Sequence, residues 1–209
     1  MPAGTALPLI DAVNEGDHAA LSRAIAKGFD RESRDGDERT ALMLATRAND
    51  IEAARLLIAA DADVNAKDAI KDTPFLYAGA EGRDEILIMT LGAGADLADT
   101  NRYGGTALIP ACHHAHPSTV RILLATPIDI DHANDLGWTA LMETVILGNG
   151  GPVFLEILKR LLDAGADADI PDLEGIAPLA HARALGFNSL AQMLETGRSS
   201  AWTTGCISG

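Results

Sequence analysis

One stretch, Thr40-Ala41-Leu42-Met43-Leu44-Ala45, decides the fold, because variants of it return along the chain at an interval of 33 residues. The later copies are Thr73-Pro74-Phe75-Leu76-Tyr77-Ala78, Thr106-Ala107-Leu108-Ile109-Pro110-Ala111 and Thr139-Ala140-Leu141-Met142-Glu143-Thr144. The same step back from Thr40 reaches Leu7, and a sixth copy begins at Ala177, 38 residues after Thr139. A fixed period of about 20–50 residues is typical of a repeat array. The sequence therefore predicts repeats that start near 7, 40, 73, 106, 139 and 177.

These copies resemble the Thr-Pro-Leu-His-x-Ala opening of ankyrin repeats, whose length is also about 33 residues. The resemblance implies an all-α solenoid of about six helix-turn-helix units with short hairpin-like fingers. It covers residues 1–197, with an insertion near 149–153 in the fifth repeat, and it leaves residues 198–209 as a flexible tail.

The second half of each unit has helical apolar spacing, as in Ile51–Ile58, and then runs into a turn. Gly28, Gly94 and Gly165 stand at these turns, where glycine suits the left-handed backbone that ends a helix. Pro127 replaces this glycine in the fourth repeat, and its ring fixes φ at a negative value. We expect the second helix of that repeat to end differently.

The predicted fingers open with Asp or Asn and most of them have Gly next to last, as in Asn134-Asp135-Leu136-Gly137-Trp138. An Asp or Asn side chain accepts hydrogen bonds from backbone a few residues on, and glycine supplies a positive φ. Each finger is therefore predicted to be a tight turn.

The family resemblance implies a non-catalytic scaffold that binds another protein through the concave face formed by finger tips and first helices. Tyr103 and Trp138 are the expected anchors, because aromatic side chains bury a large area at little entropic cost. The full set of candidate contact residues is Ile70, Tyr103, His113, His114, Leu136, Trp138, Ile146 and Leu147. The alternative is structural: Trp138 covers the first helix of its own repeat, and the inserted loop covers Ile146 and Leu147.

The segment Cys112-His113-His114-Ala115-His116 holds four side chains that bind zinc or copper in other proteins. Consecutive residues of a helix point about 100° apart, and the ligand spacing of zinc sites is absent. We therefore predict no metal and no cofactor. A small-ligand or metal-binding module at Tyr103, His113, His114 and Trp138 remains the alternative function.

No enzyme signature stands out. The chain has neither a phosphate-binding loop of the G-x-x-x-x-G-K type nor a nucleophile elbow. Gly148-Asn149-Gly150-Gly151-Pro152 precedes a predicted helix but carries no Lys, Ser or Thr for phosphate, and it is expected to be a flexible, protruding turn. The Asp residues recur with the repeat as turn and capping groups, so no catalytic residue is predicted.

Charge and composition bear on partners and location. Against 16 Lys and Arg the chain has 30 Asp and Glu, a formal charge of −14. This balance disfavours nucleic acid and anionic membranes, and it favours a partner with a basic surface or a monomer kept apart by its charge. No apolar run is long enough to cross a membrane, two cysteines make no disulfide framework, and the first residues lack a signal pattern. These features predict a cytoplasmic protein, or a periplasmic one if a signal peptide has been removed.

Two stretches, residues 73–83 and 101–111, together with the insertion after Gly148, resemble a bacterial group of single-domain ankyrin-repeat proteins. Members of that group resemble accessory factors for redox enzymes in some cases and host-directed effectors in others. The resemblance does not choose between these roles.

Overall fold

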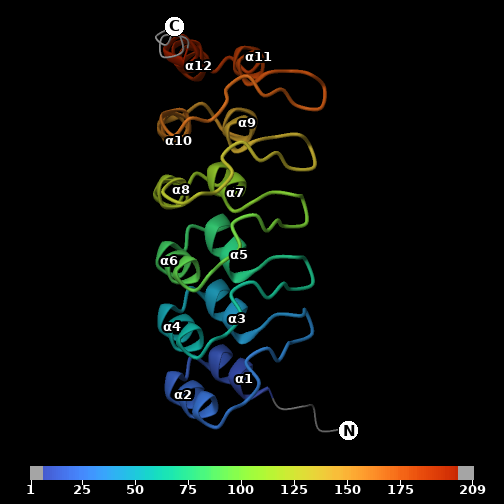
Figure 1. Cartoon of the computed structure of the whole chain (residues 1–209), viewed down its shortest axis with the longest axis vertical. Helices are drawn as coiled ribbons and strands as arrows, with labels where there is room; N and C mark the ends of the chain where they lie inside the picture. The colour runs from blue at the N-terminus through green and yellow to red at the C-terminus, as the bar shows by residue number, and fades with distance from the viewer. Residues whose placement is uncertain (1–6, 202–209) are drawn as a thin grey trace, which may run out of the picture. The chain divides into compact units, whose positions relative to one another are not determined.

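The computed structural model describes residues 7–201 of the 209-residue chain. Within that range it forms twelve α-helices and no β-strand (Figure 1). The chain divides into two compact units, Met1–Arg102 and Tyr103–Gly209. None of the helices between residues 7 and 201 has the length and apolar character needed to cross a bilayer.

The first unit contains three helix pairs: α1 (Pro8–Glu15) with α2 (His18–Ala26), α3 (Ala41–Ala48) with α4 (Ile51–Ala59), and α5 (Pro74–Ala80) with α6 (Asp84–Gly92). The second unit contains α7 (Leu108–His113) with α8 (Pro117–Leu124), α9 (Ala140–Ile146) with α10 (Pro152–Asp163), and α11 (Pro178–Ala184) with α12 (Asn188–Ala201). In each unit the first helices pack on one another in one layer and the second helices in another. The fingers extend from the first helices (Figure 1).

Small residues let neighbouring first helices approach closely. The residue five positions after the start of each repeat motif is buried in every repeat. It is Ala12, Ala45, Ala78, Ala111, Thr144 and Ala182 in turn. At the one position without alanine, the Thr144 hydroxyl donates to the Ala140 carbonyl at 2.8 Å, so the extra polar group is satisfied inside its own helix.

The repeated threonine caps the first helix. The hydroxyl oxygens of Thr40, Thr73 and Thr139 accept hydrogen bonds of 3.2, 3.1 and 3.2 Å from the backbone N–H three residues on. A cap of this kind is worth about 1 kcal/mol. Thr106 is different: α7 begins only at Leu108, so the threonine is one residue too early, and its buried hydroxyl has no hydrogen-bond partner.

The helix ends follow the predicted glycines. Gly28, Gly94 and Gly165 have φ of 74°, 89° and 94°, and Asp61 takes the same left-handed place at 62°. In the fourth repeat none of residues 125–127, all of which the structure describes, has a positive φ. There the N–H and the hydroxyl of Thr126 both donate to the Leu123 carbonyl, which confirms that α8 ends differently.

The fingers are tight, hairpin-like turns. The Asn134 side-chain oxygen accepts from the N–H groups of Leu136 (2.9 Å) and Trp138 (3.0 Å), and the Asn134 N–H donates to the Trp138 carbonyl. The fingers that open with Asp35, Asp68 and Asp172 repeat this pattern. Adjacent fingers are joined by backbone hydrogen bonds, Ala69 N–H to Asp37 O in the first unit and Asp135 N–H to Tyr103 O in the second.

The inserted segment is packed, not a free protrusion. A Cβ added to Gly148 would lie 2.3 Å from the Thr144 carbonyl oxygen, and one added to Gly150 would lie 2.8 Å from the Phe187 ring. The extra residues divide between the loop 147–151 and α10, which has 12 residues where α4 and α6 have 9. The expectation of a flexible protruding turn is therefore wrong, because these glycines admit close contact with α9 and Phe187.

At the C-terminus, α12 continues to Ala201 and so includes four residues, 198–201, that the sequence analysis assigned to the tail. No proline follows Gly197 in this segment, so nothing in the backbone stops the helix there. The rest of the predicted tail, residues 202–209, lies outside the described residues.

The contact between neighbouring fingers can be tested at Gly137, whose φ is 73° and whose added Cβ would lie 2.9 Å from Leu173 Cγ. Gly137→Ala should lower the free energy of unfolding by about 3 kcal/mol, from left-handed strain plus overpacking. Gly175→Ala is the matched control, since its φ is 79° but the added Cβ meets nothing within 4 Å. The control should lose only about 1 kcal/mol. Urea unfolding measures both, and equal losses would contradict the finger contact.

Candidate functional site

Seven of the eight predicted contact residues belong to the second unit, while Ile70, exposed on a finger, belongs to the first. We call these seven the second-unit patch: Tyr103, His113, His114, Leu136, Trp138, Ile146 and Leu147. Three of them are large apolar side chains with high exposure, Tyr103 at 59%, Leu136 at 54% and Leu147 at 41%. Trp138 and Ile146 are half-buried, and both histidines are exposed.

Hydrogen bonds bring much of the patch together. The Tyr103 carbonyl accepts from Asp135 N–H, which places the Tyr103 finger beside the finger that carries Leu136. Asn134 holds the N–H groups of Leu136 and Trp138 and also reaches α9 through its side-chain amide. The fingers and the first-helix layer of this unit are therefore one connected surface.

The residue at the centre of these contacts is Glu143, which the sequence analysis missed. It lies on α9 and is 7% exposed. Its Oε1 accepts a hydrogen bond of 2.9 Å from Asn134 Nδ2, and its Oε2 lies 3.9 Å from His113 Nδ1. Burial raises the pKa of Glu143 to about 7, against the opposing effects of the His114 charge and the Asn134 hydrogen bond.

The position of Glu143 within the repeat explains its bond to the finger. The equivalent residue of the sixth repeat is His181, whose Nε2 lies 2.7 Å from Oδ2 of Asp172, the opening residue of its own finger. In both repeats the fourth residue after the motif start ties the first helix to the finger. The second, third and fourth repeats have Leu44, Tyr77 and Pro110 at this place, and the first repeat has Asp11 but no finger before it, so a carboxylate at this place in a repeat that has a finger was the signal in the sequence.

The structure does not bring the histidines and Cys112 together as a group of metal ligands within the described residues. The His113 and His114 rings are 4.8 Å apart, and burial together with the His114 charge lowers the pKa of His113. Cys112 is fully buried and hydrogen-bonded with the Thr144 side chain, and burial raises the pKa of its thiol. No group of three or more ligating side chains exists within residues 7–196 to hold a metal ion. The metal-binding alternative therefore gains no support from the described residues.

The charges of the second unit are unevenly placed. Between residues 103 and 182 the only Lys or Arg residues are Arg121, Lys159 and Arg160, all on second helices. Eight acidic residues of this unit lie on fingers, turns and α9: Asp129, Asp131, Asp135, Glu143, Asp167, Asp169, Asp172 and Glu174. The first-helix layer adds one cation, Arg183 of α11, which pairs with Glu195 at 2.6 Å.

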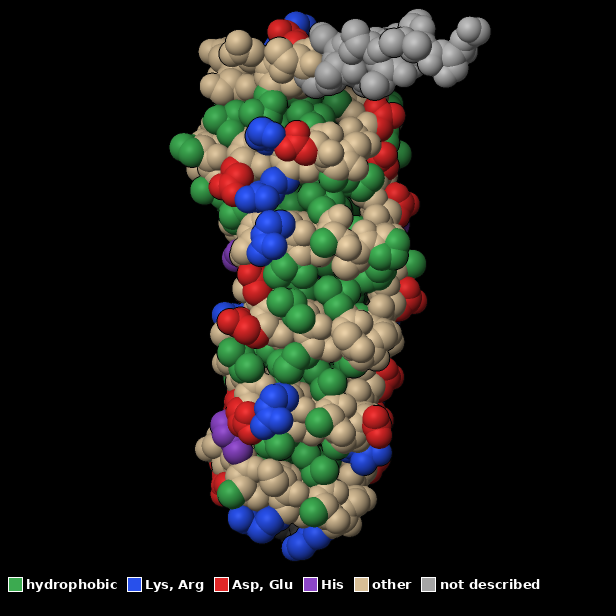
Figure 2. All heavy atoms as spheres, turned by 60° about the vertical axis from the view of Figure 1, so that its left-hand side comes forward, with side chains coloured by type: hydrophobic (Ala, Val, Ile, Leu, Met, Phe, Trp, Pro, Cys, Tyr) green, Lys and Arg blue, Asp and Glu red, His purple; other side chains and the backbone are tan. Residues whose placement is uncertain are grey.

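The second helices have a different distribution of charge from the fingers and first helices. In each unit their outer face, which comes forward in Figure 2, shows bands of hydrophobic side chains with charges of both signs interspersed. On α10, Arg160 pairs with Glu156 at 2.7 Å and Lys159 with Asp163 at 2.5 Å. The excess of negative charge in the second unit therefore lies on its finger and first-helix side.

In the first unit the fingers and first helices use their basic residues internally. Arg39 pairs with Asp35 at 2.9 Å and with Asp37 at 2.7 Å. The Arg47 guanidinium lies 4.7 Å from the centre of the Tyr77 ring, an intramolecular cation–π contact. Arg39 and Arg47 therefore already have partners within the first unit.

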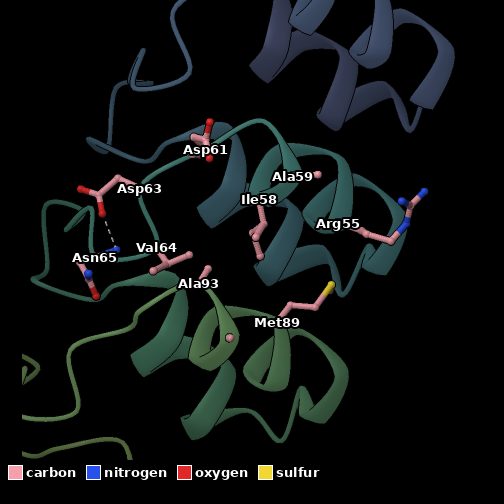
Figure 3. Close-up of a pocket in the computed structure, with 11 residues that line it drawn as sticks. Arg55, Ile58, Ala59, Asp61, Asp63, Val64, Asn65, Met89 and Ala93 are labelled. Carbon is pink, nitrogen blue, oxygen red and sulfur yellow. Dashed lines mark hydrogen bonds between the residues drawn. The ribbon is translucent and has the colours of Figure 1, made fainter.

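A groove of 620 Å³ in the first unit is the other candidate (Figure 3). Ile58 of α4 and Met89 of α6 line it, and Arg55 extends away from the acidic turn at Asp61 and Asp63. Arg55 pairs with Glu52 at 2.6 Å. The polar groups of the groove thus serve the surrounding turns and helices, and most of its lining residues are exposed. It has the character of the furrow between two consecutive second helices.

Comparison with known proteins finds the same repeats. The family model described as Ankyrin repeats (3 copies) matches residues 9–101 and 75–172. The ankyrin repeat protein YahD of Escherichia coli (strain K12) is 36% identical over 184 residues, which cover 88% of this chain and 92% of YahD.

Solved structures agree with the sequence comparison. An ankyrin repeat domain from Acinetobacter baumannii AYE is 49% identical with a TM-score of 0.88, over 91% of this chain and 97% of that one. The ankyrin repeat domain of Bcl-3, a member of the IkappaB protein family, is 27% identical with a TM-score of 0.84, over 93% and 86% of the two chains. These matches confirm the predicted all-helical repeat fold.

The environment of Glu143 makes a pH-dependent prediction. The pKa of Glu143 is about 7 in the folded chain, whereas the ordinary value for a glutamate, which we take for the unfolded chain, is 4.5. Between pH 4.5 and pH 7 the folded chain therefore holds a proton that the unfolded chain has released. Wild-type stability should therefore fall as pH rises from about 5 to 8, by about 2 kcal/mol from this group. Glu143→Gln keeps an oxygen for Asn134 but does not titrate, so its stability relative to wild type should rise across this window.

Urea unfolding at pH 5, 6, 7 and 8 measures the difference. The control is Glu156→Gln, which makes the same substitution at an exposed carboxylate of α10. The lowered pKa of His113 acts in both wild type and variant and favours unfolding as pH falls below about 6.5. A Glu143→Gln difference that does not change with pH would contradict the buried carboxyl.

Proposed function

The chain belongs to the ankyrin-repeat family, and we propose that it is a non-catalytic scaffold that binds another protein through the second-unit patch. The observation that carries the proposal is the exposure of Tyr103 and Leu136 on adjacent finger tips, where neither side chain is needed to cover the core. Aromatic and large aliphatic side chains on a connected exposed surface are typical of protein interfaces. The half-buried Trp138 lies at the base of the finger that carries Leu136 and extends this surface toward α9.

The acidic character of the same side supports a protein partner with a basic surface over nucleic acid or an anionic membrane. Phosphate groups would be repelled by the carboxylates of the fingers, turns and α9. The proposed scaffold acts as a monomer in the cytoplasm. Sedimentation of the purified chain and fractionation of its native cell would test these two points.

Affinity capture from a lysate of the native cell tests the binding role. Wild type should retain a protein that the double variant Tyr103→Ala, Trp138→Ala loses, because that variant removes both aromatic anchors. The matched control is Ile88→Ala, Val153→Ala, which truncates two exposed apolar side chains on the second helices α6 and α10 and should retain the same protein. Retention should be stronger at about 50 mM than at about 500 mM salt, since the opposed charges are screened within a shorter distance at high salt.

Thermal unfolding of each variant separates loss of binding from loss of fold. Tyr103→Ala alone should leave the melting temperature within about 2 °C of wild type, because the side chain is largely in solvent. Identical sets of captured proteins from wild type and the aromatic double variant would contradict the proposal. So would an equal loss in the control variant.

A further inference from the structure

The carboxylate of Glu143, on α9, differs from the carboxylates of the second-unit fingers in how many of its oxygens accept hydrogen bonds. Asp172 illustrates the common type: its Oδ1 accepts from two backbone N–H groups and its Oδ2 contacts His181, so the turn uses both oxygens. Glu143 has only its Oε1 engaged by a hydrogen bond, from Asn134. Its Oε2 is 3.9 Å from His113 Nδ1, which is beyond hydrogen-bond distance.

The surroundings of Glu143 suit a cation that arrives from outside. The side chain keeps 10% of its surface open, next to the exposed His113. Burial, together with the His114 charge, lowers the pKa of His113, so the His113 imidazole is neutral at neutral pH and does not repel a positive charge; the His114 charge also acts on Glu143 and is the group with which an arriving cation would compete. In a partly desolvated site a charge-assisted hydrogen bond is stronger than at an exposed carboxylate.

From this geometry we propose that the partner presents a lysine or arginine side chain flanked by apolar residues, and that Glu143 Oε2 binds this cation while Tyr103 and Leu136 contact the flanking residues. This inference rests on the proposed function, since it names the chemistry of the partner at the same patch. The Asn134 bond positions the carboxylate, and the Leu147 N–H to Glu143 carbonyl bond fixes its place near the end of α9.

Charge complementarity selects this occupant over others. Eight carboxylates lie on the fingers, turns and α9 of the second unit, and the Arg183 of its first helices is already paired with Glu195, so an acidic peptide would be repelled. In the first unit, by contrast, Arg39 already pairs with the finger carboxylates Asp35 and Asp37, and Arg47 already covers the Tyr77 ring.

A purely structural role for Glu143 makes a different prediction. If the side chain serves only to tie α9 to its finger, as His181 ties α11, then glutamine should replace it without loss, because its oxygen still accepts from Asn134. The charge matters only if a cation binds. Glu143→Gln therefore separates the two roles.

The test uses the full chain and a phage library of random 12-residue peptides, selected on wild type at about 50 mM salt. Selected peptides should be enriched in Lys or Arg next to Leu or aromatic residues. A synthetic peptide of the enriched sequence then serves as the probe, titrated calorimetrically against wild type, Glu143→Gln and the control Glu156→Gln. We expect Glu143→Gln to weaken binding at least about tenfold and Glu156→Gln less than about twofold.

A double-mutant cycle identifies the contact. Replacing the enriched Lys or Arg of the peptide by norleucine should weaken binding to wild type about tenfold, but should have little further effect on Glu143→Gln, because groups in contact are not additive. Additive losses would overturn the proposal. So would selected peptides without basic residues, a library that yields no binder, or a peptide that binds Glu143→Gln as well as wild type.

The outcomes also separate this inference from the proposed function. If capture of a protein is lost in the Tyr103→Ala, Trp138→Ala variant but not in Glu143→Gln, the scaffold role is supported and the proposed contact between Glu143 and a cation is rejected. If a basic peptide binds wild type but not Glu143→Gln, while no captured protein is lost in the aromatic variant, the cation site is supported and the proposed protein partner at the second-unit patch is rejected.

Discussion

The close packing of short helices on their neighbours is the constraint on which the rest of this structure depends. Ten of the twelve described helices have six to nine residues and the first helices never exceed eight, a length at which an isolated helix is unstable in water. Their stability therefore comes from the contacts between pairs. The buried small residue in each first helix sets how closely the layers approach, and the Thr caps and finger turns satisfy the backbone groups that such short helices leave open at their ends.

This constraint explains which parts of the fold the sequence could predict. The 33-residue period is visible in the sequence itself, and the glycines at helix ends are local features, determined by residues within about five positions of one another. Both features could therefore be predicted from the sequence alone. The capping role of Thr40, Thr73 and Thr139 was not predicted, and Thr106 does not share it because capping depends on where the helix begins, and α7 begins only at Leu108. The packed inserted loop was likewise missed, since Gly150 owes its role to Phe187, a residue of the next repeat.

The candidate site shows the same division at a finer scale. Exposure of Tyr103 and Leu136 follows from their places at finger tips, so repeat position alone identified them. The environment of Glu143 is assembled from three segments: its own helix, the finger residue Asn134 and His113 at the end of α7. A sequence shows a carboxylate at a variable position but not the distances to these neighbours. Only the folded chain distinguishes an acid that ties a finger from one whose second oxygen is left without a hydrogen bond.

Acidity in this fold has two physical origins, and their difference bears on function. Many Asp residues are present because a carboxylate accepts backbone N–H groups in a turn, and such bonds stabilise the ionised form: the Ile176 N–H bond lowers the pKa of Asp172. These carboxylates would recur in any repeat of this kind and give the surface its overall sign without marking a site. Burial acts in the opposite direction at Glu143 and raises its pKa, so the fold is less stable with this group ionised than with a neutral one. A repeat array readily accepts an apolar residue there, as Leu44 shows in an earlier repeat. The cost of ionising Glu143 in the folded chain is what the cation of the proposed partner would offset.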